Sequence, residues 1–227
     1  MKKFIEPANI NTSKTKAIFT AKDFACDIKS LAKEFDVPED KVYLPDQKHT
    51  GRVQVLELDL KPIKVDAVLT KRKGILIGVH VADCVPILLY DAQKAVIGAV
   101  HAGWRGTANQ ILKNTVKTMR DKFRCSAENI LVAVGPSIRQ CCYNVGDDVN
   151  TAVQKATGEG SYHRSQDDKL FVDLSSANVI QAMSSGIPQK NIWQSEECTC
   201  CSPLGFYSYR RTKDSAARQG GFIGMYR

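Results

Sequence analysis

The stretch ADCVPILLYDAQKAVIGAVHAGWRG, residues 82–106, decides the fold because it holds two apolar runs joined by a short polar segment. This composition predicts two antiparallel strands with a turn near residues 91–94. Cys84 and His101 are about equally far from that turn, so we expect them side by side at the open end of the hairpin, within about 5 Å. A thiol and an imidazole at that distance form either a nucleophile–base pair or two ligands of a soft metal.

Outside this hairpin, the remaining predicted elements do not alternate regularly between strand and helix. Helices are predicted over residues 23–37 with Asp23 as cap, over 107–123 with Thr107 as N-cap, within 141–158, and behind Asp173 with Gly186 as C-cap. Strands are predicted within residues 17–20, 41–60, 65–91, 94–102, 129–134, 206–211 and 217–227. This order favours an α+β fold, a single domain over residues 1–227 with a mixed β-sheet or β-sandwich core flanked by helices.

Composition narrows the class of protein. The chain has 227 residues, 43% of them hydrophobic, and a net charge of +8 spread without a long basic stripe. We therefore expect no nucleic-acid partner, and the absence of an apolar run of about 20 residues predicts no membrane partner. The start of the sequence lacks a secretory signal, so the eight cysteines predict a reduced, cytoplasmic protein rather than a disulfide scaffold.

A third candidate ligand is His49, which lies shortly before the strand-like segment RVQVLEL. Two histidines and one cysteine form the ligand set of a catalytic zinc site that keeps its fourth position open. The three residues are far apart in sequence, so the spacing alone favours a small buried Cys84 and two histidines without a metal.

Several motifs occur in an order that resembles one bacterial family. They are VADCVPILLYD, AVHAGWRGTANQIL, VGPSIRQCCYNVGDDV, DLSSANVIQ, ECT, and FYSYRR followed by ARQGGFIG. Together they resemble the laccase-like proteins, also called multicopper polyphenol oxidases or peptidoglycan editing factors. The resemblance implies a purine nucleoside phosphorylase, acting on adenosine, inosine and methylthioadenosine, that also deaminates adenosine. It implies zinc, with copper as an alternative metal, held by His49, Cys84 and His101.

The chain departs from the family pattern in three places. Thr50 separates His49 from Gly51, where the family has the glycine directly after the histidine. Val81 stands where threonine is common, and residues 12–27 do not show the glycine- and asparagine-rich family motif. The resemblance therefore assigns no substrate contacts to the N-terminal segment.

The activity implied by the family needs proton transfer and anion binding. Asp83 is the candidate proton shuttle beside Cys84, and its alternative role is that of a strand-end carboxylate that positions its neighbours. The turn Gly103, Trp104, Arg105, Gly106 precedes a predicted helix, so its backbone and the Arg105 guanidinium suit phosphate. Trp104 suits purine stacking or core packing. Weaker phosphate candidates are Arg210, Arg211 and Arg218, and Arg211 completes the predicted set of a site for a purine nucleoside and phosphate.

Other reactive side chains have open roles. His80 lies four residues before Cys84, so a regular strand would place both on one face. Cys141, Cys142, Cys198, Cys200 and Cys201 fit packing near the site wall better than a redox pair or half of a zinc site, since a lone C-x-x-C spacing is a weak signal. The oligomeric state is left open by the sequence.

Two other functions remain open at this point. One is a Cys-His hydrolase or amidase acting on cell-wall precursors, with Cys84 as nucleophile and His101 as base; it would work without metal. The other is a copper phenol oxidase. A multicopper cluster needs many histidines and the chain has four, so copper oxidation is the weakest of the three hypotheses.

Overall fold

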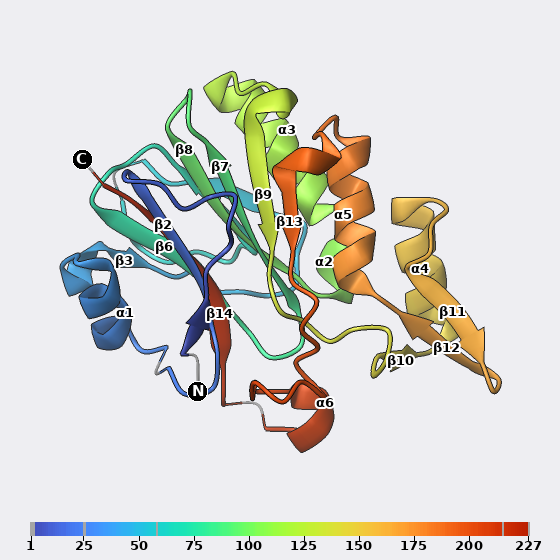
Figure 1. The fold of residues 1–227 in the computed structure, drawn as a ribbon. Helices are drawn as coiled ribbons and strands as arrows, with labels where there is room; N and C mark the ends of the chain where they lie inside the picture. Colours follow the sequence, from blue (N-terminus) through green and yellow to red (C-terminus); the bar gives the residue numbers. More distant parts are fainter. Residues whose placement is uncertain (1–2, 25, 58, 215, 227) are drawn as a thin grey trace.

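The computed structural model describes residues 3–24, 26–57, 59–214 and 216–226, and its centre is a pair of β-sheets packed face to face (Figure 1). The five-stranded sheet runs β1 (Phe4–Ile5), β2 (Thr15–Thr20), β14 (Gln219–Met225), β6 (Ile75–Val81) and β3 (Val42–Tyr43). The six-stranded sheet runs β13 (Ile192–Gln194), β9 (Ile130–Val134), β7 (Val85–Asp91), β8 (Val96–Ala102), β5 (Ala67–Thr70) and β4 (Val53–Val55). Both sheets are mixed, since β3 pairs parallel with β6, β4 with β5 and β13 with β9.

The predicted hairpin is confirmed as the centre of the six-stranded sheet. β7 and β8 pair antiparallel, with Pro86 opposite His101 and Val85 opposite Ala102. Every residue of both strands is buried, because the sheet is covered on both faces.

Three apolar layers hold the fold together. One lies between the sheets and joins residues such as Phe19 and Ile223 to Leu88 and Ala99. A second packs α3 (Ile111–Phe123) and α5 (Leu174–Ser184) on the outer face of the six-stranded sheet, and a third packs α1 (Ile28–Phe35) on the outer face of the five-stranded sheet. The predicted α+β sandwich flanked by helices is therefore confirmed.

A small extension lies beyond these helices, at the right of Figure 1. It contains β10 (Asn144–Val145), β12 (Lys169–Val172), β11 (His163–Gln166) and the helix α4 (Asp147–Thr157). Two short helices complete the part that concerns the site: α2 (Trp104–Ala108) and α6 (Tyr209–Thr212). Single 3₁₀ turns cover Glu39–Lys41, Ala127–Asn129 and Gln189–Asn191.

The start of two predicted helices is wrong. The first helix begins behind Asp27, not Asp23, because the Asp27 carboxylate accepts a hydrogen bond from the Ser30 backbone N–H at 2.9 Å. Thr107 is not an N-cap either: it lies inside α2, where its buried hydroxyl accepts from Asn178 at 2.9 Å. The chain breaks between α2 and α3 at Gln110, whose φ is +56°.

Two predicted strands also differ. Residues 206–211 do not form a strand, because Ser208 caps the short helix α6 by accepting from the Arg211 backbone N–H at 3.2 Å. His80 and Cys84 do not share a strand, since β6 ends at Val81 in one sheet and β7 begins at Val85 in the other. By contrast, the helix behind Asp173 is confirmed, with its carboxylate accepting from Ser176 at 3.0 Å.

No helix in the described ranges combines the length and the apolar character that crossing a membrane requires.

Candidate active site

Three side chains from distant parts of the sequence meet at one edge of the six-stranded sheet. His49 comes from the loop before β4, Cys84 from the residue before β7, and His101 from the end of β8. Their potential ligand atoms all lie within 4.8 Å of one another. The Cys84 Sγ lies 3.9 Å from the His49 Nε2, and the two imidazole centroids are 4.7 Å apart. The structure thus brings together the three residues that the sequence singled out.

Gly103 is required at the floor of this cluster. A Cβ atom on Gly103 would lie 2.8 Å from the Cys84 Sγ and 3.0 Å from the His49 Cδ2. The first separation is shorter than Cβ atoms tolerate and the second is tighter than most contacts, so any other residue would displace Cys84 and press on His49.

The backbone is strained at two of the positions that aim these side chains. His49 has φ +58° and Asp83, directly before Cys84, has φ +85°. Residues other than glycine rarely adopt this left-handed backbone conformation, which costs on the order of 1–3 kcal/mol per residue. The surrounding hydrogen bonds hold the two turns in place, and most of them end on two aspartates.

Asp66 is the first of these aspartates, and it organises the loop that carries His49. Its fully buried carboxylate accepts hydrogen bonds from the backbone N–H groups of Lys48, His49 and Thr50 at 3.2, 2.9 and 2.6 Å. It also lies 2.8 Å from the His101 Nδ1. A carboxylate on Nδ1 orients the imidazole and leaves Nε2 for a ligand or substrate, as in carboxylate–histidine–metal arrangements. Sequence reasoning missed Asp66, which reads there only as the start of a strand.

The pKa values of Asp66, His101 and Cys84 depend on one another because the three side chains are in contact. Burial alone would raise the pKa of the Asp66 carboxyl, but hydrogen bonds from His101 and Thr50 outweigh it and hold the pKa well below its usual range. Burial opposes charge on His101, yet the neighbouring Cys84 and Asp66 raise the pKa of its imidazole to about 9. Burial would also raise the pKa of the Cys84 thiol, but His101 and then His49 lower it to about 6. The cluster therefore favours a thiolate at Cys84.

This donor set fits a metal. A thiolate, two imidazoles and a carboxylate behind one imidazole are what soft and borderline divalent ions use in open catalytic sites. His49, Cys84 and His101 could hold such an ion, with Asp66 fixing the orientation of His101.

A cavity of about 300 Å³ opens beside the cluster, at the lower end of the size range of ligand pockets. Its walls come from the β7 edge, α2, the start of α5, α6 and the loops around residues 138 and 143. They are formed by His49, Ala82, Asp83, Cys84, Trp104, Arg105, Ile138, Tyr143, Leu174, Tyr209, Arg210 and Lys213. The pocket therefore combines aromatic faces, three cationic side chains and two of the three candidate metal ligands, His49 and Cys84.

The predicted residues Trp104 and Arg105 both line this pocket. The Arg105 guanidinium lies over the Trp104 ring, 4.2 Å from its centroid. It is exposed and makes no hydrogen bond or ion pair with any residue that the structure describes. Gly106 directly follows Arg105 in α2 and lies against the backbone of His101.

Arg211 points away from the pocket. Its guanidinium donates to the backbone carbonyls of Cys200 at 2.8 Å and Phe206 at 2.6 Å. The neighbouring Arg210 lines the pocket instead, while donating to the Asn144 carbonyl at 2.9 Å. The helical conformation of α6 turns the two adjacent arginines in different directions.

Asp83 is the second organising aspartate. Its side chain accepts hydrogen bonds from the Thr199 hydroxyl at 2.6 Å, the Ser208 hydroxyl at 3.1 Å and the Arg210 backbone N–H at 2.7 Å. This ties the start of β7 to α6 across more than 100 residues of sequence. The bonding favours the positioning role that the sequence left open beside proton transfer.

A second hollow shares His49 and Cys84 with the first pocket. His80 and Arg218 line it, together with Gln47 and His101. The His80 Nε2 lies 3.0 Å from the Cys26 carbonyl, and burial lowers the pKa of this imidazole. His80 is thus held beside the cluster but is not one of its three candidate ligands.

Three further wall residues with polar side chains were missed from the sequence: Tyr143, Tyr209 and Lys213. Tyr143 and Tyr209 belong to the quoted motifs CCYNVG and FYSYRR, which carried the only signal for them. Burial, followed by the charge of Cys84, raises the pKa of the Tyr143 hydroxyl to about 12, so it stays protonated as a hydrogen-bond donor.

Curated relatives share most of the chain. It is 36% identical over 211 residues to a protein named adenosine deaminase RL5 from an unknown prokaryotic organism, covering 87% of this chain and 79% of the relative. It is 38% identical over 200 residues to a purine nucleoside phosphorylase from Clostridium acetobutylicum, covering 86% and 81%. The relatives thus carry the names of both activities that the sequence suggested.

Solved structures share the fold. YlmD from Geobacillus stearothermophilus superposes with a TM-score of 0.87 at 26% identity, covering 95% of this chain and 93% of that one. A Bacillus licheniformis protein titled hypothetical protein YfiH gives a TM-score of 0.85 at 24% identity. The family model described as multi-copper polyphenol oxidoreductase laccase matches residues 20–226, and on this evidence the chain belongs to that laccase-like family.

Proposed function

We propose that this chain is a zinc-dependent purine nucleoside enzyme that catalyses phosphorolysis of adenosine, inosine and methylthioadenosine and deaminates adenosine. The observation that carries the proposal is the meeting of a metal-ligand cluster with a pocket of aromatic and cationic walls. The names of the relatives, adenosine deaminase and purine nucleoside phosphorylase, support the same two reactions.

Different residues would bind the metal and the purine base. Zinc held by His49, Cys84 and His101 would supply Lewis-acid chemistry and an activated water. The aromatic faces of Tyr143 and Tyr209 suit a purine, since flat bases stack on such rings.

Phosphate would be bound by cations. The Arg105 guanidinium lies at the pocket wall without a hydrogen bond to any residue that the structure describes, and Arg210 and Lys213 add positive charge. Asp83 holds the Arg210 backbone, so it positions part of this anion site through α6. A cytoplasmic location agrees with the eight free cysteines of the structure.

The first test is incubation of zinc-loaded protein with adenosine, with and without phosphate, followed by chromatography. Adenine formed only with phosphate would show phosphorolysis, and inosine formed without phosphate would show deamination. Cys84→Ala should lose both products. Adenosine that survives in both buffers would contradict the proposal for this substrate.

A second candidate function rests on the low pKa of the Cys84 thiol beside His101, which suits a cysteine nucleophile. Such a hydrolase or amidase, acting on cell-wall precursors, keeps its activity in a metal chelator, whereas the nucleoside enzyme loses it. Copper oxidation of phenols has less support, because only two of the four histidines of the chain enter the cluster.

A further inference from the structure

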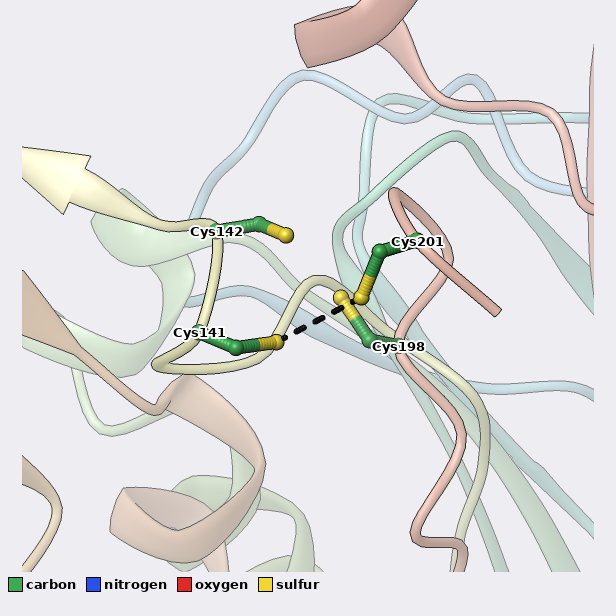
Figure 2. A group of neighbouring side chains, drawn as sticks. All are labelled: Cys141, Cys142, Cys198 and Cys201. Carbon is green, nitrogen blue, oxygen red and sulfur yellow. Dashed lines mark hydrogen bonds between the residues drawn. The ribbon is translucent and has the colours of Figure 1, made fainter. Parts of the chain in front are cut away.

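Four cysteines form a second cluster of potential metal ligands, separate from the cluster of His49, Cys84 and His101. Cys141 and Cys142 come from the turn before β10, and Cys198 and Cys201 come from the turn between β13 and α6 (Figure 2). Their four sulfur atoms all lie within 4.8 Å of one another, and the Cys141 and Cys201 sulfurs are 3.6 Å apart. We propose that these four cysteines form a tetrahedral thiolate site for a structural Zn²⁺ ion.

The distances suit this ion. Zinc–sulfur bonds of about 2.3 Å in a tetrahedron place the sulfurs about 3.8 Å from one another. The observed spacing brackets that value, whereas a disulfide bond is about 2.05 Å long and joins only two of the four sulfurs. A disulfide between Cys141 and Cys201 would leave two thiols beside it without a role.

Backbone donors surround the sulfur of Cys198. Its buried sulfur accepts a hydrogen bond from the Arg139 backbone N–H at 3.4 Å. The backbone N–H groups of Cys200 and Cys201 are directed at the same sulfur. Converging amides of this kind form an anion-binding concavity, which is common around metal-bound sulfur.

Positive charge flanks both turns. The Arg210 guanidinium donates to the Cys142 carbonyl at 3.4 Å, and the Arg211 guanidinium donates to the Cys200 carbonyl at 2.8 Å. Binding would release the thiol protons to solvent, leaving four thiolates around one divalent cation and a net charge of −2. The two arginines would offset that charge, which gives Arg211 a role that the pocket does not.

The site would also connect two walls of the active-site pocket. The first turn lies between Ile138 and Tyr143, and the second precedes α6 with Arg210. The turns already pair through one parallel bridge, Ser137 with Cys198. A zinc ion bound by the four cysteines would hold the two turns together, whichever reaction the pocket performs.

The test is metal stoichiometry of reduced protein after zinc loading and gel filtration. We expect two zinc ions per chain, one for each cluster. Cys84→Ser should retain one, and the double variant Cys198→Ser with Cys201→Ser should also retain one. Cys200→Ser is the matched control, since it changes a neighbouring thiol outside the cluster and should keep two. A double variant that binds as much zinc as the unchanged chain would overturn the proposal.

A second measurement avoids changing the thiol cluster. X-ray absorption at the zinc edge of the Cys84→Ser protein should show a shell of sulfur neighbours only, at about 2.3 Å. Nitrogen or oxygen neighbours would refute the site. A Cys141–Cys201 disulfide, found by mass spectrometry after alkylation of unreduced protein purified without added oxidant, would refute it as well.

Discussion

At the scale of single residues, Asp66 shows how much of the site lies behind the ligands. One buried carboxylate fixes three successive backbone amides and the ring of His101. Asp66→Asn keeps the volume but replaces one acceptor oxygen with a donor, so at least one of these contacts is lost. We expect zinc affinity to fall about 10- to 100-fold, as measured by competition with a chromogenic chelator. Asp121→Asn, on the exposed side of α3, makes the same charge change and should leave affinity unaltered.

Cys84 should be far more reactive than Cys125 in the metal-free protein. A pKa of about 6 makes most of this thiol a thiolate at pH 7, and the reactive fraction falls as the pH drops through 6. Burial and then Asp91 raise the pKa of the Cys125 thiol to about 12, so Cys125 serves as the internal unreactive control. Alkylation with iodoacetamide between pH 5 and 8, followed by peptide mass spectrometry, should show this order. Zinc should protect Cys84, and equal labelling with and without zinc would contradict its role as a ligand.

At the scale of elements, the turn from β8 into α2 determines how closely the backbone approaches the candidate metal ligands. Gly103→Ala should displace Cys84 and His49, because the added Cβ would lie 2.8 Å from the thiol sulfur. We expect loss of bound zinc and at least a tenfold loss of activity, with the far-UV circular dichroism unchanged.

Gly106→Ala in the same motif is the comparison for Gly103→Ala. Its Cβ would lie 3.3 Å from the His101 carbonyl oxygen, a contact that a small shift relieves, and alanine favours the helix. Zinc content should therefore be retained. If the two substitutions lower the zinc content equally, the loss in Gly103→Ala does not arise from the contact of its Cβ with Cys84 and His49.

The hairpin and the meeting of Cys84 with His101 could be predicted from the sequence, because both depend on residues at fixed distances from one turn. His49 comes from a separate loop, so only its residue type and the family resemblance pointed to it. Asp66 could not be predicted, since its role arises from amides of Lys48, His49 and Thr50 in a loop without regular structure. The sequence around α6 predicts a strand, because a helix of four residues is too short to show a helical periodicity. Only the Ser208 cap distinguishes it. The four-cysteine cluster needs two turns about 60 residues apart to meet, which no local pattern reveals.

At the scale of the whole molecule, zinc should stabilise the fold through both clusters. An ion at 100 times its dissociation constant adds about 2.7 kcal/mol per site to the free energy of unfolding. For a domain of this size, that corresponds to a rise in Tm of about 5–11 °C. Differential scanning fluorimetry of the Cys84→Ser protein should retain the shift due to the four-cysteine cluster. If the Tm of that variant does not depend on zinc, the four-cysteine zinc site is contradicted.

The placement of β14 has a consequence for biosynthesis. This strand lies between β2 and β6, and it meets β2 across 200 residues of sequence, as in the bond from the Gly220 N–H to the Thr20 hydroxyl. A ribosome releases β2 and β6 long before it reaches β14, so both strands emerge with an unpaired edge. Pairings this distant form slowly, and exposed edges invite aggregation in the meantime. The nascent chain should therefore depend on chaperones until its last strand is made.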